Sequence, residues 1–227
     1  MIAATSWVPD EAARELCKLS VRVIKTLNPG EDLIVIDSCS PFDPLQFLPG
    51  SHFSFHFEDN VGAINRGGKD GAGRALSKAI AKAIEWGYDY VAVQETDFIF
   101  AKPIRPIIER MHKAGVKVAS PGLAAPYAFV EWGIFFINVA YARESKFIER
   151  YDWEHSQTWP LVEVKLEQLF GDDLFLLGLR GLRNESNAVN VANLANYFPY
   201  ANASWLTHCA DHNVYVRMLE LNGVYPT

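Results

Sequence analysis

Residues 71–97, GAGRALSKAIAKAIEWGYDYVAVQETD, combine two hydrophobic patterns in one continuous stretch. The first half places apolar side chains three and four residues apart, which predicts an amphipathic helix over residues 71–86 that ends at Gly87. The second half, YDYVAVQETD (88–97), is an apolar run of strand length. A helix that leads directly into a buried strand is typical of α/β proteins with a mainly parallel sheet.

Apolar runs and helical periodicity alternate along the rest of the chain as well. Strands are predicted at residues 2–6, 32–37, 116–120 and 133–141, with a short one within 51–60 and a late one over 172–179. Helices are predicted from Pro9 onward and over residues 104–115, 142–152, 161–170 and 210–223. Because single domains commonly reach about 200–250 residues, the sequence predicts one α/β domain whose mainly parallel central sheet is flanked by helices.

The charge balance and the cysteine pattern exclude several classes of protein. With 21 Lys and Arg against 27 Asp and Glu, the formal net charge is −6, whereas nucleic-acid binding needs clustered basic residues. We therefore expect no nucleic-acid partner. Cys17, Cys39 and Cys209 are widely spaced and form no CxxC pair, so they indicate neither a zinc site nor a disulfide framework.

The sequence shows no pattern of secretion or membrane insertion. Its N-terminus has no basic start and reaches Asp10 and Glu11 before any long apolar stretch. The most apolar later segment, residues 129–142, is shorter than the ~20 residues that a bilayer requires and contains Glu131 and Asn138. We expect a cytoplasmic protein without a transmembrane segment.

Two carboxylates interrupt the apolar strand of residues 88–97 at its end. Glu95 and Asp97 are two residues apart, so in a strand their side chains project to the same side. Open α/β sheets bind ligands at the carboxyl ends of their strands, and two acids there suit a hard divalent cation such as Mg²⁺ or Mn²⁺. Without a cation, buried acids require partners such as Arg74 or Lys102, because an unpaired buried charge is costly.

The glycine-rich segment VGAINRGGKDGAGRA (61–75) matches neither common nucleotide loop. A Walker A loop would need Lys at position 68 followed by Ser or Thr, whereas the chain has Gly68-Lys69-Asp70. A dinucleotide fingerprint would need a third glycine where the chain has Leu76. Two interpretations stay open: a flexible loop that caps a helix, or a segment that lets backbone and cations approach a diphosphate at the helix start.

The ordered set of motifs resembles the A-type glycosyltransferases, the nucleotide-diphospho-sugar transferases, and is family-2-like. The resemblance implies a single-domain Rossmann-like GT-A fold, in which residues 1–100 bind the nucleotide-sugar and residues 101–227 form the acceptor side. The motifs that carry it cover nearly the whole chain: ATSWVPDEA (4–12), IVIDSCSP (34–41), residues 60–97 from Asn60 to Asp97, and THCADHNVY (207–215).

By this resemblance, the acids after the strand hold a metal ion, Mn²⁺ or Mg²⁺. Asp97 is the metal ligand, and Glu95 stands where the family usually has Asp, so it contacts either the metal or the sugar and ribose of the donor. His208 resembles the late histidine that supplies a further metal or diphosphate contact, with His212 as its substitute. Both histidines also suit an ordinary polar role.

The resemblance also implies a set of donor-binding residues. Asp37, with Ser40 near it, should meet the nucleoside base or ribose, although both could instead satisfy backbone amides in a turn at the strand end. The residues expected along the nucleotide-sugar are Asn60, Arg66 and Arg74.

Glycosyl transfer with inversion needs a carboxylate base for the acceptor hydroxyl. In inverting relatives the base begins the helix after the acceptor-side strand, and Glu163 holds that position here, with Glu167 one turn later on the same face. Asp172 and Asp173 follow that helix, and Glu131 precedes Trp132 and Gly133. The candidate bases are therefore Glu163, Glu167, Asp173 and Glu131, and a solvated acid is the alternative for each.

Together with these patterns, the resemblance implies a metal-dependent glycosyltransferase that moves a sugar from a UDP- or GDP-sugar to a hydroxyl of a glycan or another acceptor, with inversion. Two other functions remain open at this stage. One is metal-dependent hydrolysis of a phosphoester or pyrophosphate, and the other is a non-catalytic module that binds a nucleotide-sugar.

Overall fold

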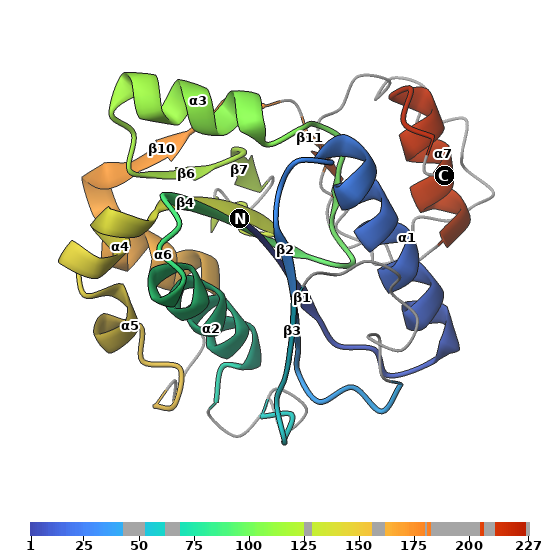
Figure 1. Ribbon diagram of the computed structural model, residues 1–227, viewed down its shortest axis with the longest axis horizontal. Helices are drawn as coiled ribbons and strands as arrows, with labels where there is room; N and C mark the ends of the chain where they lie inside the picture. Colours follow the sequence, from blue (N-terminus) through green and yellow to red (C-terminus); the bar gives the residue numbers. More distant parts are fainter. Residues whose placement is uncertain are drawn as a thin grey trace.

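The computed structural model describes residues 1–42, 53–61, 69–124, 129–155, 162–179, 181–182, 205–206 and 212–225. Within these residues, seven strands form a central sheet with helices on both faces (Figure 1). The strand order is β10-β6-β9-β4-β1-β2-β3. The strands are β1 (Ile2–Ser6), β2 (Leu33–Asp37), β3 (Phe53–His56), β4 (Tyr90–Glu95), β6 (Val118–Ser120), β9 (Ile134–Asn138) and β10 (Leu174–Leu176).

Among these seven described strands, β9 alone runs against its neighbours. β1 pairs in parallel with β2 and β4, β2 with β3, and β6 with β10, whereas β9 pairs antiparallel with both β4 and β6. The chain between β6 and β9 contains an antiparallel pair, β7 (Leu123–Ala124) and β8 (Phe129–Val130), in place of the crossover helix that a parallel return would need. The prediction of a mainly parallel α/β sheet is confirmed.

The two faces of the sheet carry two separate cores. Four helices, α2, α4, α5 and α6, pack on one face, and α1 and α3 pack on the other (Figure 1). Strand β9 serves both, since Phe135 and Ile137 belong to the first core and Ile134 and Phe136 to the second. Helix α7 packs against α1. The helices are α1 (Glu11–Leu27), α2 (Gly71–Glu85), α3 (Arg105–Ala114), α4 (Val139–Glu144), α5 (Phe147–Arg150), α6 (Val162–Phe170) and α7 (His212–Leu221).

Two predicted elements end earlier than expected because a side chain or a turn stops them. Strand β4 ends at Glu95, and Thr96 and Asp97 belong to a turn before β5 (Ile99–Phe100). The strand predicted over 133–141 ends at Asn138, whose side chain accepts a hydrogen bond from the Tyr141 amide at 2.9 Å and so caps α4. The helix predicted over 142–152 is consequently two short helices, α4 and α5.

The two predicted halves of the chain contribute to the same central sheet. β1 to β4 lie in residues 1–100, and β6, β9 and β10 lie in residues 101–227. In the central sheet the two sets meet along the ladder between β4 and β9. The smaller strands β11 (Gly181–Leu182) and β12 (Trp205–Leu206) pair with each other, and β12 pairs with β5. Across the described ranges, no helix is both long enough and apolar enough to cross a bilayer.

Candidate active site

The order of connections creates a crevice between the carboxyl ends of β1 and β4. From β1 the chain builds outward to β2 and β3, and α2 then returns it to β4 on the other side of β1. Open α/β sheets bind ligands at such a switch in strand order. A cavity of about 610 Å³ lies here, lined by the ends of β1 and β4, the start of the loop after β2, the first turns of α1 and α2, and Trp132.

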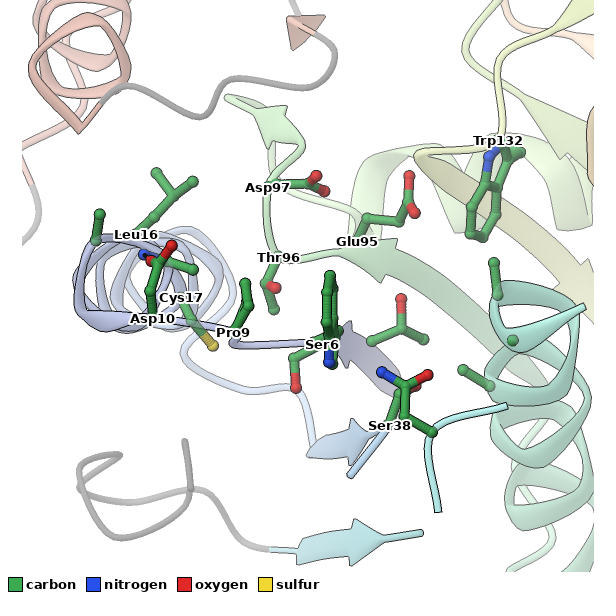
Figure 2. A pocket seen from close by; sticks show the side chains of 18 residues that line it. Ser6, Pro9, Asp10, Leu16, Cys17, Ser38, Glu95, Thr96, Asp97 and Trp132 are labelled. Carbon is green, nitrogen blue, oxygen red and sulfur yellow. Dashed lines mark hydrogen bonds between the residues drawn. The ribbon is translucent and has the colours of Figure 1, made fainter. Parts of the chain in front are cut away.

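Glu95 and Asp97 both line this cavity. Figure 2 shows their side chains directed to the same space, on the side of Trp132, whereas the side chain of Thr96, which also lines the cavity, points in a different direction. The same-side arrangement predicted for a strand is therefore present, although a turn produces it in place of a strand. Strand β4 delivers the pair to the cavity because its residues before Glu95 pair on both edges, with β1 and with β9.

Two helices begin at the cavity. Asp10 caps α1 by accepting a hydrogen bond from the Ala13 amide at 2.8 Å, and Asp70 caps α2 by accepting one from the Gly73 amide at 2.7 Å. The first turns of both helices, including Ala13 and Ala72, line the cavity. Helix N-termini carry partial positive charge and favour anions. The cavity therefore combines three carboxylates, those of Asp10, Glu95 and Asp97, with two helix N-termini.

This combination fits a divalent cation bound together with an anionic ligand. Carboxylate oxygens are the ligands that Mg²⁺ and Mn²⁺ prefer, and Glu95 and Asp97 supply them from one turn. Across the part of the chain that the structure describes, no three His, Cys, Asp or Glu side chains are grouped so that they could hold a metal ion. Glu95 and Asp97 could supply two oxygen ligands to such an ion, and phosphate oxygens could supply others. His208 lies outside the described residues.

Asp37 lies behind the cavity wall and is completely buried. Its carboxylate accepts hydrogen bonds from the Ser6 hydroxyl at 3.0 Å and from the Ser40 amide and hydroxyl at 2.8 and 2.5 Å, and it pairs with His56 Nδ1 at 2.7 Å. Ser40 in turn accepts from the Val8 amide. These contacts are those of the strand-end turn considered above, and a contact of Asp37 or Ser40 with a nucleoside stays a prediction.

Of the residues expected along the nucleotide-sugar, Asn60 lines the cavity. Arg74 lies on α2, where its guanidinium pairs with the Asp59 carboxylate at 2.8 Å and stacks on the Phe57 ring, 3.8 Å from its centroid. Arg66 lies outside the described residues. The roles of these three residues in donor binding remain predictions.

Three of the four candidate bases lie in or near α6 and β8. Glu131 is 1% exposed, and its Oε1 accepts a hydrogen bond from the Gly133 amide at 3.0 Å. Glu163 is buried in the first turn of α6. Glu167 accepts a hydrogen bond from the Val130 amide at 3.0 Å and so ties α6 to β8. Glu131 directly precedes Trp132, which lines the cavity.

The structure does not bring Asp173 to the cavity. Asp173 precedes β10, which runs parallel to β6, so it lies at the amino edge of the sheet, opposite the ends of β1 and β4. There it accepts a hydrogen bond from the Tyr141 hydroxyl at 2.7 Å and lies 3.8 Å from Lys117 Nζ. Because Asp173 follows α6 in the sequence, it was predicted to lie on the acceptor side as a candidate base. The pairing of β10 with β6 instead puts it at the edge of the sheet opposite the cavity, which is the wrong edge for a base. His212 begins α7 and is exposed.

A partly buried hydrogen bond holds the start of α2 against the end of α5. The Tyr151 hydroxyl donates to Asp70 Oδ2 at 2.9 Å, and Lys165 Nζ lies 3.5 Å from the same oxygen. Burial and the negative charge of Asp70 raise the pKa of Tyr151, which keeps the phenol a donor. A Cβ at Gly73 would lie 2.3 Å from the Tyr151 ring. The first turn of α2 is thus fixed from two sides.

Replacing Tyr151 with Phe is expected to lower the free energy of unfolding by about 1–2 kcal/mol, because the partly buried Asp70 carboxylate loses a donor. Urea denaturation followed by circular dichroism measures the change. Tyr141→Phe is the matched control, since it removes the same kind of bond to Asp173 at an exposed position, where we expect less than about 0.5 kcal/mol. Equal losses in both variants would contradict the argument.

Sequence reasoning did not select Trp7 or Cys17, which also line the cavity. Trp7 follows β1 directly and is 51% exposed, which is unusual for a tryptophan. Its position directly after a predicted strand could have identified it as a candidate ligand-binding residue. Cys17 is buried on α1 and hydrogen-bonded to the Thr96 side chain, and burial raises the pKa of its thiol to about 12. A thiol in that state is unreactive at neutral pH.

Solved structures of glycosyltransferases share this fold at low sequence identity. The chain aligns with the bifunctional glycosyltransferase WbbM at a TM-score of 0.57 and 11% identity, over 99% of this chain and 44% of that one. It aligns with an active-site mutant of LgtC at 0.54 and 15%, over 98% and 95% of the two chains. A glycosyltransferase involved in glycosylation of the major capsid of PBCV-1 aligns at 0.53 and 11%, over 98% of each chain.

No protein-family model and no curated protein matches the sequence. The structural similarity shows that the chain has the A-type glycosyltransferase fold, and this confirms the fold that the motifs predict. The chain spans less than half the length of WbbM but nearly all of LgtC.

Proposed function

We propose that this protein is a metal-dependent glycosyltransferase that moves a sugar from a UDP- or GDP-sugar to a hydroxyl group of a glycan or another acceptor. The observation that carries the proposal is the position of Glu95 and Asp97, whose carboxylates line the cavity at the strand-order switch of this fold. LgtC, a galactosyltransferase of the same fold, was solved in complex with donor and acceptor sugar analogues, which supports a sugar-nucleotide ligand.

The walls of the cavity suit the three parts of such a donor. The exposed ring of Trp7 offers a stacking surface for a nucleobase. The first turns of α1 and α2 offer positive helix ends for a diphosphate. Trp132, on the side to which the two acids are directed (Figure 2), offers an apolar surface for a sugar ring.

The two acids support metal dependence through simple electrostatics. On their own, the Glu95 and Asp97 carboxylates would repel the diphosphate of the donor. A divalent cation, Mn²⁺ or Mg²⁺, held by Asp97 and Glu95 would turn this repulsion into attraction and would offset the charge of the departing nucleoside diphosphate.

Transfer with inversion requires a base, and we assign this role to Glu131 because it is the candidate next in sequence to a residue that lines the cavity. It directly precedes the cavity residue Trp132, and the Gly133 amide orients its carboxylate. Replacing Glu131 with Gln is expected to lower kcat by about 10²–10³-fold and to leave the Kd for the nucleotide within about twofold. Initial rates at saturating donor and acceptor, beside calorimetric Kd values, measure both. An unchanged kcat would pass the role to Glu163 or Glu167.

The proposal as a whole is tested by calorimetric titration of the protein with UDP, GDP and their sugars, with and without Mn²⁺. We expect one nucleoside diphosphate to bind tightly with Mn²⁺ and at least about tenfold more weakly when EDTA removes the metal. Absence of binding to every nucleotide would overturn the donor site.

Turnover then separates the remaining functions. Transfer to a glycan or other hydroxyl acceptor is the expected result. Donor hydrolysis with no acceptor requirement would replace the proposal with a hydrolase. Binding without turnover across a broad panel of acceptors would replace it with a non-catalytic module.

A further inference from the structure

Gln94, the residue before the two acids, holds the turn that carries them. Its side chain is 3% exposed, and Nε2 donates a hydrogen bond to the Phe98 carbonyl at 3.0 Å. The turn itself is closed by the Phe98 amide, which donates to the Glu95 carbonyl at 3.2 Å. The backbone bond and the side-chain bond together span the four residues from Glu95 to Phe98.

The same turn is also fixed from its two flanks. The Glu95 amide donates to the Gly133 carbonyl at 2.9 Å, and the Thr96 amide donates to the Thr5 carbonyl at 3.0 Å. The Phe98 ring packs directly against Gly133, where a Cβ would lie 2.2 Å from Phe98 Cδ2. These bonds fix the backbone at Glu95, Thr96 and Phe98.

Residue 94 is a buried polar residue in an otherwise apolar part of β4. The neighbouring positions of β4, Ala92 and Val93, are apolar and buried, and a primary amide in such a place costs free energy unless its hydrogen bonds are made. Strand alternation directs Gln94 away from the cavity-facing Glu95. Its amide therefore reaches the turn from behind, where an apolar side chain of the same length could fill the space but could not bond the Phe98 carbonyl.

We propose that Gln94 is a positioning residue for the cation site: its amide sets the shape of the Glu95–Phe98 turn and thereby the relative placement of the Glu95 and Asp97 carboxylates in the cavity. The inference rests on the proposed function, because it assumes that the two acids bind a divalent cation. Residues that orient metal ligands without touching the metal commonly change metal affinity by about 10–100-fold when replaced.

The test measures Mn²⁺ binding directly, by the electron paramagnetic resonance signal of free Mn²⁺, in the wild type and in Gln94→Met. Met keeps the length and volume of Gln but cannot donate to the Phe98 carbonyl. We expect Kd for Mn²⁺ to rise about tenfold, and kcat to fall while the KM for the acceptor stays within about twofold. Gln94→Asn, whose amide is one methylene too short to reach the carbonyl, is expected to weaken Mn²⁺ binding to a similar degree, and it serves as the test if the Met variant does not fold.

Asn28→Ala is the matched control for loss of a buried amide. Asn28 is 9% exposed at the end of α1, where its side chain bonds the Ile24 carbonyl and the Ile104 amide. It lies ~17 Å along α1 from Cys17, the last residue of that helix that lines the cavity. It should lower thermal stability but leave Kd for Mn²⁺ unchanged. Tight Mn²⁺ binding in Gln94→Met and Gln94→Asn would overturn the positioning role and leave the proposed function intact. Absence of Mn²⁺ binding in the wild type would overturn both.

Discussion

Replacing Asp97 with Asn is expected to lower the rate of sugar transfer by about 10³-fold or more, which corresponds to about 4 kcal/mol of transition-state stabilisation. Asn keeps the size and shape of Asp but removes the negative charge. The cavity would then hold a divalent cation with one carboxylate, Glu95, in place of two. Both donor binding and departure of the nucleoside diphosphate depend on the cation in the proposed mechanism, so kcat and the Kd of the nucleotide should both worsen.

Initial rates of transfer and calorimetric titration with the nucleoside diphosphate and Mn²⁺ measure these effects. Glu109→Gln is the matched control, because it makes the same chemical change at an exposed position on α3 and should leave both quantities within about twofold. Glu95→Gln separates two roles for Glu95. Weaker Mn²⁺ binding in this variant assigns Glu95 to the metal, whereas unchanged Mn²⁺ binding with a raised KM for the donor assigns it to the sugar or ribose. Full activity in Asp97→Asn would defeat the metal site.

Replacing Gly133 with Ala is expected to destabilise the fold by about 3 kcal/mol or more. The new Cβ would lie 2.2 Å from Cδ2 of Phe98, and Phe98 is fully buried. Relief would require shifting either β9 or the turn that carries Glu95 and Asp97. For a chain of this size we expect the melting temperature to fall by about 6–12 °C.

Thermal and urea unfolding measure this loss, and Gly30→Ala provides the control. A Cβ at Gly30 has Arg105 Nη2 as its nearest neighbour, at 3.7 Å, so this variant should stay within about 0.5 kcal/mol of the wild type. A double variant tests the cause. Phe98→Ala removes the Cδ2, Cγ and Cε2 atoms that the new Cβ would meet, so Gly133→Ala should cost less in that background than in the wild type. Additive losses would show that the clash with Phe98 is not the reason.

Much of the stretch over residues 71–97 could be predicted because its signals are local. The helix over 71–86 and the strand before Glu95 follow from apolar spacing within one stretch of chain, and the structure has both as α2 and β4. The prediction that Glu95 and Asp97 share a side needed only their separation of two residues. Their place at a cavity followed from the rule that strands of a parallel sheet present ligand sites at their carboxyl ends.

Features that depend on distant pairs could not be predicted. Tyr151 bonds Asp70 across 81 residues, and no periodicity connects the two. Asp173 looked equivalent to Glu163 and Glu167 as an acid near α6, but the pairing of β10 with β6 decides which edge of the sheet it occupies. The role of Gln94 could not be predicted either. In the sequence it is one more residue at the end of the strand, and its side chain reaches the Phe98 carbonyl only once the turn has formed.

The reversed strand β9 has a consequence for cooperativity. Among the described strands of the central sheet, those of residues 1–100 and those of residues 101–227 are joined by one ladder, between β4 and β9. The end of that ladder is the bond from the Glu95 amide to the Gly133 carbonyl, beside the cavity. Local opening of this joint would therefore break the ladder between the two sets of strands and displace Glu95 in a single event. A ligand that binds through Glu95 and Asp97 would oppose that opening, so occupancy of the cavity would tie the two halves of the chain together.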